Sequence, residues 1–226
     1  MEPLGLEEAV GSSREEVVQS YLTEHPQVLT TSFGLPRVWA EGGPDMAGNA
    51  VAAVPKMKLG NEYVTDFVIV VCRSVRLEVI LVELEPPTAR PFTKAGDFGR
   101  RLNGAVKQLT DWFAWLEPSE NRDYFRRTLR ESLHMDSWEY GAVSYRPLFE
   151  PFTEWYHAKI IIGRRAMMTQ NDNRWRSAFL KSTGGRLEIL PYDRLLFTER
   201  QLKTKGKEGI EAALREKWKK SYGTDV

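Results

Sequence analysis

Apolar side chains recur at helical spacing close to the start of the chain. The repeat lies between Ser13 and Pro26 and predicts an amphipathic helix of about three turns. Its expected apolar face consists of Val17, Val18, Tyr21 and Leu22. Ser13 and Glu16 have the spacing of a capping box at the start of this helix. Pro26 ends the pattern because its ring disfavours helical geometry in the residue before it.

Two β-rich runs, residues 62–72 and 76–85, are separated by a short polar turn and predict an antiparallel hairpin. Both runs are almost continuously apolar, so their sheet should be covered on both faces. The preceding residues 34–60 are rich in Gly and Pro. They predict a long irregular connection, with a short strand near residues 37–40.

The second half of the chain alternates between helical and strand patterns. A helical apolar stripe at residues 97–116 should pack on the hairpin, and Pro118 closes it. Further segments follow: a charged helix at 119–133, strands at 158–163 and 186–190, a helix at 173–182 and a basic helical tail at 198–226. Because a helix separates the last two strands, we expect them to pair in parallel. Residues 138–154 fit no single pattern.

Together these segments predict one α/β domain over residues 1–226, with a central mixed sheet flanked by helices. The composition is that of an ordinary globular protein, with 42% hydrophobic and 28% charged residues. Because the net charge is only +1, a phosphate-binding surface has to come from local clusters of Lys and Arg. The single cysteine, Cys72, excludes an intrachain disulfide, and no apolar run is long enough to span a membrane. We therefore expect a cytoplasmic protein without a membrane partner.

Three acidic residues, Asp66, Glu83 and Glu85, lie within or at the end of the apolar runs, where an unpaired charge is costly to bury. Side chains alternate along a strand, so Glu83 and Glu85 share one face. An antiparallel register that places Asp66 opposite Glu83 would need only a turn of about six residues. Converging carboxylates repel one another unless one is protonated or a divalent cation lies between them, and oxygen ligands favour Mg²⁺ or Mn²⁺. Such a site suits phosphodiester hydrolysis. Exposure at strand ends, or pairing with arginines, explains the same acids equally well.

Four sequence motifs stand out: VELEPP, FTKAGDFGRRLNGAVKQLTDW, KIIIGR and RLEILPYDRLL. They resemble the nuclease domain of the Shedu anti-phage proteins, and the resemblance covers most of the chain. It implies the restriction-endonuclease-like core of the PD-(D/E)XK nucleases. In that group an Asp and a Glu bind the catalytic metal, a residue two positions after the Glu handles the water, and a helix Gln steadies the site. By motif position these roles fall on Asp66, Glu83, Glu85 and Gln108.

Glu85 departs from the pattern of that group, which has Lys at this position, although some members resemble this chain in using Glu-x-Glu. A Glu accepts a proton from water or joins a second metal ion, whereas a Lys stabilises hydroxide and the charge developing on phosphate. Lys94 and Lys107 are candidates for the missing cation, and both are equally explained as ordinary exposed charges. The resemblance also relates Glu16 to an acid that approaches the metal from the first helix, although its capping role explains it without a metal.

Pairs of arginines near the expected strand and helix ends are the candidate contacts to nucleic-acid phosphates. They are Arg100, Arg101, Arg164 and Arg165. The resemblance implies a Mg²⁺-dependent DNA endonuclease of anti-phage defence that forms a homo-oligomer and acts with a regulatory partner or sensor domain. Two alternatives stay open. One is a catalytically degenerate module of the same fold that binds nucleic acid or forms oligomers, and the other is an RNase.

Overall fold

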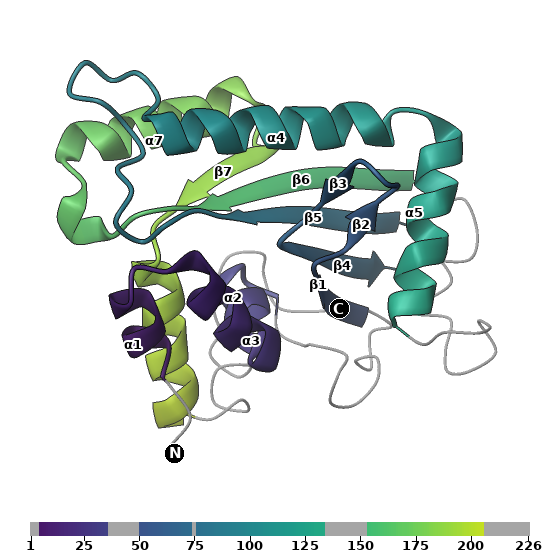
Figure 1. Ribbon diagram of the computed structural model, residues 1–226, viewed down its shortest axis with the longest axis horizontal. Coiled ribbons are helices and arrows are strands. Elements are labelled where there is room, and N and C mark those ends of the chain that lie inside the picture. Colours follow the sequence, from purple (N-terminus) through teal and green to yellow (C-terminus); the bar gives the residue numbers. More distant parts are fainter. Residues whose placement is uncertain (1–4, 36–49, 74–75, 134–152, 206–226) are drawn as a thin grey trace, which may run out of the picture.

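Figure 1 shows a twisted sheet with helices against both of its faces. The computed structural model describes residues 5–35, 50–73, 76–133 and 153–205. Within these ranges the main sheet has five strands in the order β1-β4-β5-β6-β7. Their bounds are Ala50–Pro55 (β1), Phe67–Arg73 (β4), Arg76–Leu84 (β5), Thr153–Ile161 (β6) and Leu187–Leu190 (β7). The pairs β1–β4 and β4–β5 are antiparallel and the pairs β5–β6 and β6–β7 are parallel, so the sheet is mixed.

The hairpin predicted from the two apolar runs is formed by β4 and β5. Its register pairs Phe67 with Val82, so the next positions along the two strands are Asp66 and Glu83. The expected antiparallel pairing, with Asp66 opposite Glu83, is therefore confirmed. A small ribbon of β2 (Lys58–Leu59) and β3 (Tyr63–Val64) lies between β1 and β4 in the chain.

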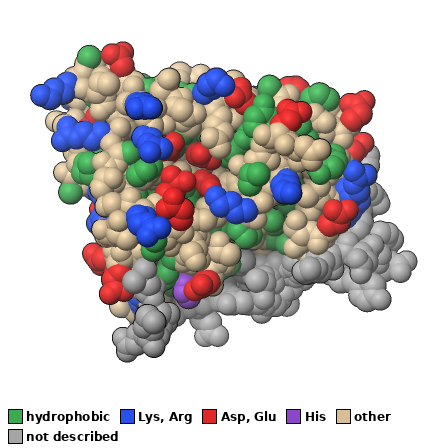
Figure 2. Space-filling view, in the orientation of Figure 1, with side chains coloured by type: hydrophobic (Ala, Val, Ile, Leu, Met, Phe, Trp, Pro, Cys, Tyr) green, Lys and Arg blue, Asp and Glu red, His purple; other side chains and the backbone are tan. Residues whose placement is uncertain are grey.

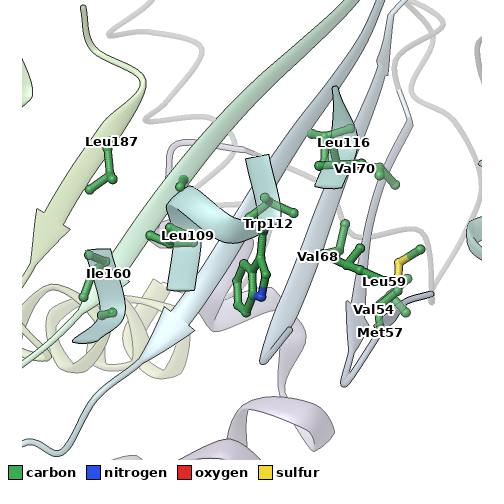
Figure 3. Close-up of a cluster of buried hydrophobic side chains, with 14 of the residues drawn as sticks. Val54, Met57, Leu59, Val68, Val70, Leu109, Trp112, Leu116, Ile160 and Leu187 are labelled. Carbon is green, nitrogen blue, oxygen red and sulfur yellow. The ribbon is translucent and has the colours of Figure 1, made fainter. Parts of the chain in front are cut away.

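One face of the sheet is covered by three helices: α4 (Arg100–Leu116), α5 (Ser119–Ser132) and α7 (Gln170–Ser182). α4 lies along the sheet with its apolar stripe against the strands, as its sequence pattern predicted. Figure 3 shows part of this core: Leu109, Trp112 and Leu116 from α4, and Val68, Val70 and Ile160 from the sheet. Among the described helices, none combines the length and the apolar character needed to cross a membrane.

The other face is covered by the N-terminal helices together with a helical segment at residues 193–205. The N-terminal helices are α1 (Leu6–Gly11), α2 (Glu15–Glu24) and α3 (Pro26–Ser32). Successive residues of β5 alternate between the two cores: Leu81 belongs to the core under α4, whereas Ile80 and Val82 belong to the core under α2. This double burial explains why the strand sequences are continuously apolar, and it confirms the sheet covered on both faces.

The parallel pairing of the last two strands is also confirmed, and so is the predicted helix end before Pro26, since α2 ends at Glu24. Pro26 then starts a separate helix, α3, at a position where its missing N–H is not needed. Two other local predictions near the N-terminus were wrong. The capping box fails because Arg14 is the N-cap of α2, while Ser13 has a φ of 61°. β1 lies inside the segment expected to be irregular, because its small and branched residues suit a strand paired with β4. The strand expected at 37–40 lies outside the described residues, as do residues 138–152 and 206–226.

α4 offers a matched test of what the core contributes to stability. Leu109 is fully buried, whereas Gly104 is exposed in the same helix, and beyond its chain neighbours and its own helix backbone nothing lies within 4 Å of where a Cβ would be. We expect Leu109→Ala to lower the free energy of unfolding by about 2–5 kcal/mol, because it leaves a cavity. Gly104→Ala should raise it by up to about 1 kcal/mol, because Ala favours the helix. Urea denaturation followed by circular dichroism measures both changes. Equal effects of the two variants would contradict this packing.

Candidate active site

Three buried acids gather at one end of the β4–β5 hairpin. Asp66 directly precedes β4, Glu83 lies near the end of β5 and Glu85 directly follows β5. Asp66 is 6% exposed, and Glu83 and Glu85 are each 7% exposed. The hairpin register therefore brings these acids together out of solvent, at the positions where the sequence predicted a site.

Both carboxylate oxygens of Asp66 already have partners in the protein. Lys56 Nζ lies 2.5 Å from Oδ1, and the backbone N–H of Leu84 donates to Oδ2 at 2.7 Å. The backbone carbonyl of Asp66 accepts a hydrogen bond of 3.0 Å from Gln19 Nε2 on α2. Asp66 is thus held by β5, by the turn after β1 and by a helix of the N-terminal layer.

Glu83 is contacted from the opposite layer by the helix Gln that the motif singled out. Gln108 Nε2, on α4, donates to Glu83 Oε2 at 3.1 Å. Burial raises the pKa of Glu83 well above its ordinary value, and the negative charges of Asp66 and Glu85 raise it further. The raised pKa favours the protonated form of Glu83, and the Gln108 amide orients its side chain.

Glu85 has the least complete set of partners among the three acids. Arg101 Nη1, on α4, lies 3.8 Å from Glu85 Oε2, and this buried oxygen accepts no hydrogen bond from the described part of the chain. Burial raises the pKa of Glu85 to about 7, while Arg101 acts in the opposite direction. A buried carboxylate oxygen that accepts no hydrogen bond lacks a partner, and a cation can be that partner.

A fourth acid, Glu15 at the start of α2, also acts on this group. Burial raises its pKa, and the charge of Asp66 raises it further. The structure does not bring Glu16 to the site: its side chain is 79% exposed, and it lies 3.9 Å from Arg14 Nε. Successive helix residues point about 100° apart, so only one of the two acids faces inward. The sequence did indicate that Glu15 faces inward, because Glu15 lies three and seven positions before the buried Val18 and Leu22 and so shares their helix face.

The cations at the acids also differ from those that the sequence suggested. Lys56, beside Asp66, and Arg101, beside Glu85, are the two whose charges lower the pKa values of the acids. Lys94 is exposed in the loop after β5, and Lys107 forms a 2.9 Å ion pair with Asp111. The structure brings neither of these lysines to the acid group. No local pattern pointed to Lys56, because its approach to Asp66 depends on the pairing of β1 with β4.

The candidate phosphate contacts are spread over two elements. Arg100 and Arg101 start α4, and Arg100 is exposed. Arg164 and Arg165 follow β6, where Arg164 Nε lies 3.4 Å from Asp193 Oδ2 and the Arg165 backbone N–H donates to the same oxygen. Figure 2 shows acidic side chains gathered near the middle of one face, with Lys and Arg side chains around them.

Tyr192 is a buried residue that contacts the acid group, and the sequence did not predict this role. Its side chain is fully buried, and its hydroxyl donates to the backbone carbonyl of Glu85 at 2.9 Å. Burial raises the pKa of Tyr192 far above its ordinary value, and the charges of the four nearby acids act in the same direction. Tyr192 is therefore a neutral hydrogen-bond donor that fixes the backbone from which Glu85 projects.

The acid group has the donor chemistry of a Mg²⁺ or Mn²⁺ site, since its oxygen ligands are buried and only partly compensated. Across the ranges that the structure describes, however, no three His, Cys, Asp or Glu side chains lie close enough together to hold a metal ion as they stand. Asp66, Glu83 and Glu85 each have a polar or cationic protein partner instead. Binding a cation at all three would therefore require some of these partners to be exchanged.

Comparison with known families places this arrangement in context. The model of the family described as "Shedu protein SduA, C-terminal" matches residues 12–196. The chain belongs to this Shedu family. The matched range begins just before α2 and ends within the helical segment at 193–205, so the Shedu match includes the whole acid group and Gln108. No curated protein matches the sequence.

The raised pKa of Glu85 predicts a pH-dependent stability. Between its ordinary value of 4.5 and its folded-state value of about 7, the folded state binds more protons than the unfolded state. Glu85 therefore lowers the free energy of unfolding as the pH rises through this window, by about 3 kcal/mol. We expect Glu85→Gln to match the natural protein near pH 4.5 and to be more stable at pH 8. Urea denaturation at each pH in EDTA measures this.

The exposed Glu62→Gln variant is the control for the Glu85 experiment, and it should keep the natural pH dependence. If Glu85→Gln showed the same loss of stability between pH 4.5 and pH 8 as the natural protein, Glu85 would not be the group that titrates in this window.

Proposed function

We propose that this chain is a metal-dependent endonuclease of the PD-(D/E)XK type that hydrolyses DNA phosphodiester bonds in anti-phage defence. Membership of the Shedu family suggests the defence role. The observation that carries the nuclease proposal is the convergence of buried Asp66, Glu83 and Glu85 at one end of a hairpin, with Gln108 on Glu83. These residues occupy the positions that the resemblance assigns to a catalytic centre, with Glu85 where the group usually has Lys.

The order of elements supports a PD-(D/E)XK core. A helix of the N-terminal layer, α2, precedes three antiparallel strands, β1, β4 and β5, and α4 then leads on to the parallel β6. The acids lie on the central hairpin of this arrangement, and helices from both layers reach them. We propose that residues 1–226 act as a single nuclease domain with this core.

In this proposal Asp66 and Glu83 hold Mg²⁺ or Mn²⁺, with Glu85 and Glu15 as further oxygen donors. When bound, the cation lowers the pKa of water and neutralises charge on the phosphate. Glu85, two positions after Glu83 at the end of β5, would be the residue that accepts a proton from water. Arg101 offers a positive charge beside Glu85, where the usual Lys is missing.

A second candidate function is a catalytically degenerate module that binds nucleic acid or forms oligomers. The absence of a ready-made group of metal ligands among the described residues, together with Glu85 in place of Lys, favours it. An RNase is a third candidate, because the acid group does not distinguish DNA from RNA. Homo-oligomer formation and action with a regulatory partner or sensor domain, both implied by the resemblance, belong to the main proposal.

Cleavage assays test the nuclease proposal. Supercoiled plasmid, linear duplex, single-stranded DNA and RNA are incubated with the protein and Mg²⁺ or Mn²⁺. We expect the natural chain to cut DNA. We expect Asp66→Asn and Glu83→Gln each to cut at least about 100-fold more slowly, because each substitution removes the charge of a metal ligand. Asp111→Asn, which alters an acid paired with Lys107, should keep the natural rate. If folded natural protein cut none of these substrates, the degenerate module would replace the nuclease.

Glu15 and Glu16 give a matched pair of variants on one helix. We expect Glu15→Gln to raise the melting temperature in EDTA, because it removes a carboxylate that repels Asp66, and to weaken Mn²⁺ binding. Glu16→Gln should change neither quantity, because Glu16 is exposed. Differential scanning fluorimetry with a Mn²⁺ titration measures both effects. Equal behaviour of the two variants would place Glu15 outside the site.

A further inference from the structure

Lys56 contacts Asp66 through both its backbone and its side chain. Its backbone N–H donates to the Asp66 carbonyl at 2.9 Å, and its ammonium lies 2.5 Å from Asp66 Oδ1. Lys56 has a φ of 48°, and Ser13 is the one other non-glycine residue of the described ranges with a positive φ. A residue with a side chain adopts this conformation at a steric cost, and such cost is often found where a side chain has a specific task.

The two oxygens of Asp66 differ in how they are occupied. Oδ2 accepts from the backbone N–H of Leu84, an interaction that belongs to the frame of the hairpin. Oδ1 is occupied by a side chain that is 56% exposed and therefore has room to move away. Oδ1 is thus the oxygen that can be given up to another cation without disturbing the sheet. A divalent ion there would also repel the Lys56 ammonium.

We propose that Lys56 is the counter-cation of the metal-free site, and that a divalent cation binds by displacing the Lys56 ammonium from Asp66. This inference rests on the proposed function, because it assumes that Asp66 is a metal ligand. Lys56 stabilises the buried acids when the metal is absent and competes with the metal for the same oxygen. It therefore sets how much free Mg²⁺ or Mn²⁺ is needed to load the site.

Metal affinity, rather than cleavage, tests this competition. Mn²⁺ is titrated into the full chain by isothermal calorimetry, using the natural protein, Lys56→Met, Lys56→Gln and the control Lys58→Met. Lys58 is a nearby exposed lysine, so its variant makes the same charge change away from Asp66. We expect both Lys56 variants to bind Mn²⁺ about fivefold more tightly, the effect of removing one partly exposed ion pair. Lys58→Met should bind as the natural protein does.

The melting temperature gives a second readout of the competition. In EDTA the Lys56 variants should melt below the natural protein, because the buried acids lose a counter-charge, and Mn²⁺ should raise their melting temperature by more than it raises that of the natural protein. Asp66→Asn should abolish the Mn²⁺ response, which locates binding at this site. Lys56→Gln, which keeps a polar side chain, serves as the test if Lys56→Met does not fold.

The outcomes separate this inference from the proposed function. Tighter Mn²⁺ binding by the Lys56 variants, or binding by these variants alone, supports displacement of the ammonium. If the natural protein binds Mn²⁺ through Asp66 and the Lys56 variants bind equally or less tightly, the competition is overturned and the metal site stands. If neither the natural protein nor the Lys56 variants bind Mn²⁺, the metal-dependent function is overturned together with the competition.

Discussion

The register of the β4–β5 hairpin is the constraint on which the rest of this structure depends. Pairing of Phe67 with Val82 places Asp66 next to Glu83 and sends alternate side chains into two separate cores. A shift by one residue would turn the side chains of a strand to the opposite face. It would separate the acids and also exchange the two apolar surfaces against which the helices pack. The same pairing therefore determines both the stability of the sheet and the position of the site.

The site brings together elements from both sides of the sheet. α4 contributes Gln108 and Arg101, whereas α2 contributes Gln19 and Glu15. The two helices belong to different cores, yet both reach the end of the hairpin where the acids lie. Each layer thus has two functions, since it buries one face of the sheet and supplies side chains that hold or surround the carboxylates.

Electrostatic compensation of the acids is incomplete. The raised pKa values of Glu15, Glu83 and Glu85 have the same two causes, burial and the charges of neighbouring carboxylates. Lys56 and Arg101 oppose this, but both side chains are more than half exposed, so solvent weakens their effect. The ionised forms of these acids are therefore costly in the folded chain, and either proton uptake or a bound divalent cation relieves that cost. This is the physical basis for proposing that a divalent cation binds here.

The sequence by itself determined the elements whose pattern is local. The apolar stripe of α4, the continuous strands of the hairpin and the end of α4 before Pro118 were all predicted from neighbouring residues. Asp66, Glu83 and Glu85 were predicted as one candidate group, with exposure at strand ends left as an equal alternative, and the structure buries all three. Local spacing sufficed because helix period, strand alternation and a short turn are encoded within a few residues. The family motif, rather than spacing, singled out Gln108.

The tertiary structure decided which charges meet the acids. Lys56 reaches Asp66 through the pairing of β1 with β4, and β1 lay in a segment whose Gly and Pro content had predicted an irregular loop. Glu15 rather than Glu16 faces the site because α2 packs by one particular face on the sheet. These contacts join residues that no local sequence pattern links. They therefore form only once the strands have paired and the helices have packed.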